Sequence, residues 1–141
     1  MKRMMRMLSV VVCVAAMAAA CNKATTDQGA AAGVRVTEID LGRSLAADKG
    51  IADKTSEFRP SDTIYVSVET DGTSPQATLL TRWTYQDGQV VNESSQTIAP
   101  AGDARTEFHI SKPDGWPAGK YTLEVFLNGS AAVTKQFDVA P

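Results

Sequence analysis

The sequence predicts an all-β domain over residues 34–141, with seven strands in two packed sheets. Apolar and polar residues alternate with a period of two, most clearly where Ile64, Val66 and Val68 share one face of the segment 63–70. This alternation is typical of a strand that buries one face. Turn pairs such as Asp-Gly and Asn-Gly separate the alternating runs, and short strands with regular turns favour a sandwich.

Each predicted strand is bounded by Gly, Pro, Asp or Asn residues. The third strand places Leu79, Trp83 and Tyr85 on one face, and the Asp87-Gly88 pair after it predicts a tight hairpin to the fourth strand. The seven predicted strands are residues 34–41, 63–70, 77–85, 89–98, 104–111, 120–127 and 132–139.

The register of the last hairpin follows from the faces of its two strands. The odd-numbered residues of 120–127 share one face, and Phe137 has to meet that face. A two-residue loop in a regular ladder turns Phe137 to the wrong side. We therefore predict a three-residue loop ending at Gly129, with Leu123 opposite Val133.

The sixth strand carries a motif of a known fold. Residues 118–125 read Ala-Gly-Lys-Tyr-Thr-Leu-Glu-Val and resemble the Pro-Gly-x-x-Tyr-x-Val-x-Val corner of fibronectin type III and related bacterial immunoglobulin-like modules. Trp83 is similar to their buried strand-C tryptophan. The resemblance implies a seven-stranded immunoglobulin-like β-sandwich over residues 34–141, as in small bacterial lipoproteins with one such domain. These motifs are structural and occur in proteins of unrelated function.

The N-terminus reads as a leader. Cationic residues begin it, an apolar run (7–17) follows, and three alanines precede Cys21. The apolar run is shorter than the roughly 20 residues that span a bilayer. The leader resembles a bacterial lipoprotein signal, which implies that Cys21 is acylated and begins the mature chain; the alternative is an ordinary secretory signal. Cys13 is a rival site that lacks a small residue before it. By the same resemblance, Asn22 implies the outer membrane, facing the periplasm.

Three segments follow from this interpretation. Residues 1–20 are a signal peptide that is removed, 21–33 are the lipidated cysteine and a flexible tether, and 34–141 are the domain. The tether lacks large apolar residues, so no packing is expected of it.

Composition excludes several functions. Of 14 Lys and Arg residues three leave with the leader, so the mature chain carries 11 positive against 16 negative charges, a net of −5. This charge argues against binding of nucleic acid or of anionic lipid head groups. With Cys13 removed and Cys21 lipidated, no thiol remains for a disulfide, a metal site or a nucleophile.

No residue pattern predicts catalysis, a metal site or a cofactor. His109 is the single histidine, and alternation turns it outward, so we predict a surface side chain. The turn aspartates are typical turn formers and lack the alternate spacing of a calcium loop. No serine lies in a Gly-x-Ser-x-Gly elbow. We therefore expect the protein not to be an enzyme.

Two aromatic residues are candidate partner contacts. Trp116 lies in the loop 112–119, where it either caps the end of the sandwich beside Tyr121 or is an exposed anchor for a protein or a sugar ring. Phe126 points away from the core face and either covers the outer face or belongs to a contact patch. The long segment 42–57 is a functional loop or holds a short extra strand.

These observations lead to one main hypothesis. We expect a non-enzymatic, lipid-anchored envelope protein that acts as an accessory or protein-interaction module, with an envelope protein as its partner. One alternative is an immunoglobulin-like peptidase inhibitor that uses loops 71–76 and 98–103, or 112–119. Another is a carbohydrate- or peptidoglycan-binding module that uses Trp116.

Overall fold

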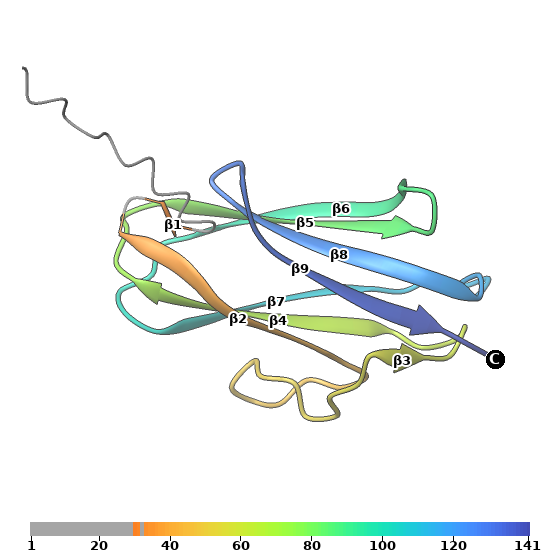
Figure 1. Ribbon diagram of the computed structural model, residues 1–141. Coiled ribbons are helices and arrows are strands. Elements are labelled where there is room, and N and C mark those ends of the chain that lie inside the picture. Colours follow the sequence, from red (N-terminus) through yellow and green to blue (C-terminus); the bar gives the residue numbers. More distant parts are fainter. Residues whose placement is uncertain (1–29, 32) are drawn as a thin grey trace, which may run out of the picture.

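Two β-sheets pack face to face in the computed structural model, which describes residues 30–31 and 33–141 (Figure 1). The predicted leader, Cys21 and the tether up to residue 29 lie outside the described residues. The strands in the described part are β1 (Ala30–Ala31), β2 (Val34–Gly42), β3 (Glu57–Phe58), β4 (Ile64–Gly72), β5 (Ala77–Tyr85), β6 (Gln89–Ile98), β7 (Ala104–Ile110), β8 (Gly119–Leu127) and β9 (Ser130–Val139).

One sheet has the order β1-β2-β4-β7 and the other β3-β9-β8-β5-β6. The seven predicted strands correspond to β2 and β4–β9, with ends within two residues of the prediction. The all-β sandwich that the sequence predicts is therefore confirmed. Every pairing is antiparallel except that of β3 with β9.

Two short strands lie outside the prediction. In β1, Ala30 and Ala31 pair with β2 through a turn at Gly33, whose φ is +85°. In β3, Glu57 and Phe58 pair with the end of β9. The pairing of β1 with β2 and that of β3 with β9 consist of backbone hydrogen bonds. Neither short strand therefore shows an alternating side-chain pattern in the sequence. The sheet therefore begins before the predicted boundary at residue 34, within the segment predicted as tether.

The core lies between the sheets and is richest in aromatic side chains toward one end. Trp83 is fully buried, as predicted, and its ring meets the edge of Phe137 with centroids 5.9 Å apart. Phe137 also stacks on Tyr121 at 5.2 Å and meets Phe58 at 5.4 Å. Ring edges packed on ring faces make such clusters favourable beyond their buried area.

Tyr121 forms the predicted corner at the start of β8. Its hydroxyl donates to the carbonyl of Pro117 at 2.7 Å, four residues upstream, which is the geometry of a tyrosine corner. Burial, with a smaller effect from Tyr85, raises the pKa of Tyr121 to about 12. The phenol is therefore neutral at physiological pH and remains a hydrogen-bond donor.

The predicted register of the last hairpin is wrong, although Phe137 does face the core. The loop has two residues, and Leu123 pairs with Lys135, while Val133 pairs with Val125. A bulge between Val125 and Phe126 inserts one extra residue into β9 and restores the alternation that a regular two-residue hairpin loses. A bulge and a three-residue loop both turn Phe137 to the core face. The alternation of side chains therefore could not distinguish between them.

Candidate interaction surfaces

Trp116 packs in the core and is not an exposed anchor. The side chain is 5% exposed, and its Nε1 donates to the carbonyl of Asp62 at 3.1 Å. The backbone amide of Trp116 donates to Pro60 at 2.7 Å, and the ring meets Tyr121 edge-on at 6.2 Å. Of the two alternatives that the sequence left open, this burial contradicts the exposed anchor, and the end cap beside the tyrosine corner agrees with the geometry.

Phe126 lies on the outer face of the second sheet and is half-buried. The Arg82 guanidinium sits over its ring, 4.9 Å from the centroid, and Arg82 Nε donates to Glu93 at 2.8 Å. That hydrogen bond raises the pKa of Arg82. A cation covers this aromatic face, so the geometry agrees with a covering role for Phe126 more than with an open apolar patch.

His109 is a surface residue, as predicted. Its side chain on β7 is 55% exposed. The ring nitrogen Nδ1 contacts the Glu107 carboxylate, and the ring lies 5.4 Å from that of Tyr65. A histidine beside an acidic partner on an exposed strand is an ordinary surface contact.

The long segment after β2 forms an arch, residues 43–56, against the outer face of the first sheet (Figure 1). It is a small hairpin: the Arg43 amide donates to Asp53, and Leu45 and Ile51 form an isolated bridge. The sequence expectation of a short extra strand was close to this arrangement. Ile51 is 7% exposed, so it packs beneath the arch as a hydrophobic anchor.

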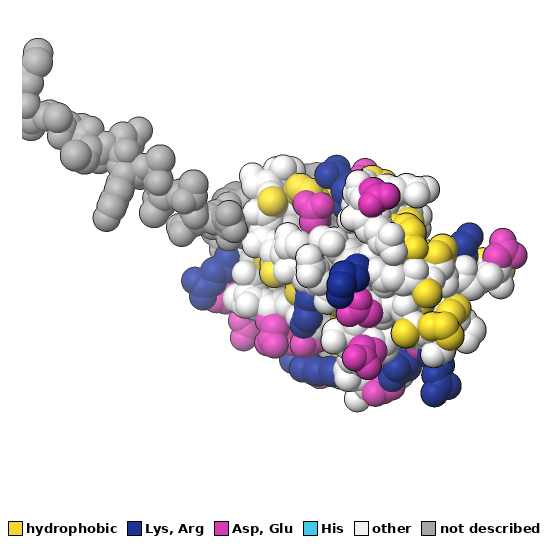
Figure 2. Space-filling view, turned by 45° about the vertical axis from the view of Figure 1, so that its right-hand side comes forward, with side chains coloured by type: hydrophobic (Ala, Val, Ile, Leu, Met, Phe, Trp, Pro, Cys, Tyr) yellow, Lys and Arg dark blue, Asp and Glu magenta, His cyan; other side chains and the backbone are white. Residues whose placement is uncertain are grey.

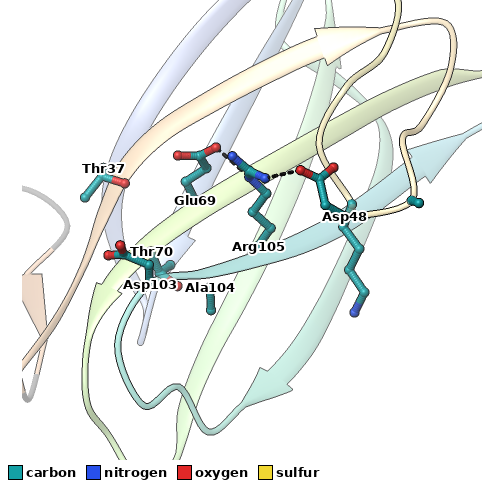
Figure 3. Close-up of a pocket in the computed structure, with 9 residues that line it drawn as sticks. Thr37, Asp48, Glu69, Thr70, Asp103, Ala104 and Arg105 are labelled. Carbon is teal, nitrogen blue, oxygen red and sulfur yellow. Dashed lines mark hydrogen bonds and ion pairs between the residues drawn. The ribbon is translucent and has the colours of Figure 1, made fainter.

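Ion pairs connect the arch to the sheet. Arg105 on β7 contacts Glu69 on β4 at 2.7 Å and Asp48 in the arch at 2.5 Å (Figure 3). The hydrogen bond from the Gly50 amide, and then the charge of Arg105, lower the pKa of Asp48. The hydrogen bond that Arg105 donates to Glu69 raises the pKa of Arg105. A polar cleft of ≈ 660 Å³ lies beside these groups. The sequence did not predict this contact, because Asp48, Glu69 and Arg105 are far apart in the chain.

Three carboxylates lie together next to this cleft. Oxygens of Glu38, Asp40 and Glu69 lie within 4.8 Å of one another. Lys54 Nζ contacts Asp40 at 2.7 Å, and Arg105 contacts Glu69. Protein cations therefore neutralise two of the three carboxylates. Figure 2 shows similar intermixing of positive and negative side chains over the lower part of one face.

Gly42, the last residue of β2, leaves no room for a side chain against the returning half of the arch, and we predict that Gly42→Ala loosens the arch. A methyl group there would lie 2.1 Å from the Asp53 carbonyl and 2.2 Å from Ile51. We expect a loss of about 1–3 kcal/mol of unfolding free energy and faster amide exchange at Arg43. Gly50→Ala is the matched control within the arch, because a methyl group there would meet only movable side chains, that of Asp48 nearest at 3.0 Å, and no backbone. Equal exchange rates in the two variants would contradict the close contact.

The three loops considered for peptidase inhibition lie at opposite ends of the sandwich. The loops 71–76 and 98–103 lie together, since Thr73 bridges Ala101. This is also the end where β1 enters, because Gly33 approaches Gly72 there. The loop 112–119 lies at the other end, beside Pro60. The chain therefore offers two separate loop surfaces.

Strand β6 has the most exposed edge. It lies at the end of its sheet, pairs with β5 alone, and each of its residues is exposed or half-exposed. The other edges are partly covered. β1 covers the start of β2, β3 covers the end of β9, and Lys135 of β9 reaches across to the Ile39 carbonyl at 3.2 Å. On β7, the Gln96 side-chain amide donates to the Glu107 carbonyl at 2.6 Å.

Comparisons with known proteins bear on the fold. An immunoglobulin-like protein from Pseudomonas aeruginosa, PA1606, is similar over 79% of this chain and 100% of its own, with 22% sequence identity and a TM-score of 0.50. The fold is immunoglobulin-like. Because the identity is low, the similarity shows the architecture and no activity. No protein-family profile matches the sequence, and no curated protein matches it either.

Two larger enzymes are similar to this chain over part of their own length. An alkylpurine DNA glycosylase, AlkC, from Pseudomonas fluorescens matches 77% of this immunoglobulin-like chain at 14% identity and a TM-score of 0.50. A β-glucosidase from Listeria innocua matches 74% at 9% identity and 0.47. The chain spans 31% of the glycosylase and 16% of the glucosidase.

Within residues 30–31 and 33–141, no helix has the length and apolar character needed to cross a bilayer.

Proposed function

We propose that the protein is a non-enzymatic, lipid-anchored protein of the bacterial cell envelope that acts as an accessory or interaction module. The observation that carries the proposal is the point where the chain enters the domain. β1 begins only nine residues after Cys21, at one end of the sandwich. An extended segment of that length reaches roughly 30 Å. The domain is thus attached by one end and presents its sides and far end.

The far end of the domain is suited to face away from an anchor at Cys21. The chain ends there, at Pro141, next to β3 and opposite β1 (Figure 1). The loop 112–119 lies at the same end. With Asn22 after the cysteine, we place the anchor in the outer membrane with the domain in the periplasm. Its partner is another envelope protein.

The two alternative functions receive less support. A peptidase inhibitor that used 71–76 and 98–103 would have to work beside its own tether, because these loops lie at the end where β1 enters. A sugar-binding module that used Trp116 lacks an open ring face, because the indole is buried.

The test uses full-length protein with a C-terminal tag, expressed in a bacterium that processes lipoproteins. We expect the protein to incorporate an alkyne fatty acid during metabolic labelling and to fractionate with the membranes. In-cell crosslinking should join it to a defined envelope protein. Cys21→Ala should lose the label and the membrane association completely, while Cys13→Ala, the matched control in the leader, should keep both. A wild-type protein without fatty acid, or one that crosslinks to no envelope protein, would contradict the proposal.

A further inference from the structure

We propose that the free edge of β6, over residues 92–98, binds an extended segment of a different polypeptide as an added strand. This inference rests on the proposed interaction function and names the surface and the class of partner. The edge is open over seven residues, which corresponds to roughly 23 Å of strand. Strand addition at an open edge gives affinity through main-chain hydrogen bonds.

β6 has a bulge at Val91, and beyond it, over residues 92–98, the edge lacks the other features that usually protect an exposed strand. It has no proline and no lysine, and its one charged residue is Glu93. The Glu93 carboxylate turns back across the sheet to Arg82 instead of shielding the edge. Proteins commonly guard edges with lysine, proline, short strands or covering segments, and β1 and β3 provide such cover elsewhere in this fold.

The side chains of β6 indicate the chemistry of the partner. Register with β5 places Asn92, Ser94 and Gln96 on one face and Glu93, Ser95 and Thr97 on the other. The Ser94 hydroxyl is already bonded to Thr81 and the Gln96 amide to the Glu107 carbonyl of β7. This leaves Asn92, Ser95 and Thr97 to offer amide and hydroxyl groups to an incoming strand. Val90, which is 51% exposed, adds an apolar contact beyond one end. With the net charge of −5 for the mature chain, these groups favour a polar, neutral or basic segment over an acidic one.

A second copy of the chain fits this edge less well than a different polypeptide. Antiparallel pairing of two β6 strands would place the tether end of one copy beside the far end of the other, because Ile98 lies at the end where β1 enters. Two anchors in one bilayer oppose that arrangement. Parallel pairing in register would place the two Glu93 carboxylates side by side, and like charges in direct opposition are destabilising.

The test selects binders from a phage-displayed library of twelve-residue peptides on the full-length protein in detergent micelles. We expect the enriched peptides to lack internal proline and to carry polar side chains at alternate positions. When bound, they should reduce the rate of amide exchange in β6. Two proline variants locate the edge, Ser94→Pro and Ser95→Pro. Because neighbouring amides of a strand point to opposite edges, one variant removes a bond to β5 and the other removes an outward donor.

The outward variant should keep the melting temperature of the wild type and weaken peptide binding at least tenfold. Its matched control is Lys112→Pro in the loop before β8, an exposed site outside both sheets, which should keep binding. No enriched peptide, peptides that protect loops instead of β6, or a dimer that disappears with the outward variant would each overturn the inference. A crosslinked partner unaffected by the outward variant would leave the interaction function standing and refute the β6 edge alone.

Discussion

Trp83→Ala is expected to lower the free energy of unfolding by about 3–5 kcal/mol. The indole is fully buried between the sheets, and its Nε1 donates to the Thr81 hydroxyl at 3.2 Å. The substitution removes the contact with Phe137 and leaves a cavity that close-packed neighbours fill only in part. Since domains of this size are stable by about 5–15 kcal/mol, the variant is expected to be marginally folded.

Urea unfolding followed by circular dichroism measures this loss. The control is Thr84→Ala, one residue further along β5 on the outer face, where the hydroxyl makes a long 3.4 Å bond to the Thr122 carbonyl. We expect the control to cost at most about 1 kcal/mol. A Trp83→Ala variant that lost no more than the Thr84 control would show that the tryptophan is not central to the core.

The sequence was sufficient for the parts of the fold that repeat or follow a local motif. Alternation in β5 assigned Leu79 and Trp83 to the core side, and both are fully buried. The Tyr121 corner was readable because its hydrogen bond spans only four residues. Short-range geometry of this kind is determined by neighbours in the chain.

Features that depend on distant partners were not predictable in the same way. For Trp116 the sequence left an end cap and an exposed anchor open, because its acceptors, the carbonyls of Pro60 and Asp62, come from another part of the chain. The Arg105 contacts with Glu69 and Asp48 join a strand to the arch. Alternation states which face a residue occupies and not which distant group it meets.

The β6 edge lies between these two cases. The turn residues on either side of β6 predicted that the strand exists and where it begins and ends. Its position at the edge is known only from the order of the strands in the sheet. A strand with polar residues on both faces carries little information about its neighbours. The same property leaves β6 without a hydrophobic face to bury, which is consistent with a strand kept at the rim of the core.

Trp116→Ala is expected to lower the free energy of unfolding by about 3 kcal/mol, and this result separates packing from partner contact. The indole is 5% exposed and donates to Asp62, so its loss leaves both a cavity and an unpaired carbonyl. Trp116→Phe fills most of the space and should cost about half as much. Lys112→Ala, on the exposed part of the same loop, should leave stability within about 0.5 kcal/mol of wild type.

Binding measured at a temperature where all three variants are folded then gives the role of the loop. If Lys112→Ala weakens capture of a partner while stability is unchanged, the loop surface contacts that partner directly. If capture falls only in Trp116→Ala and follows the fraction of folded protein, the tryptophan acts through the tyrosine corner that it packs against. A stable Trp116→Ala protein that fails to bind would contradict the buried position of the indole, because a side chain with so little exposed surface has little area to offer a partner.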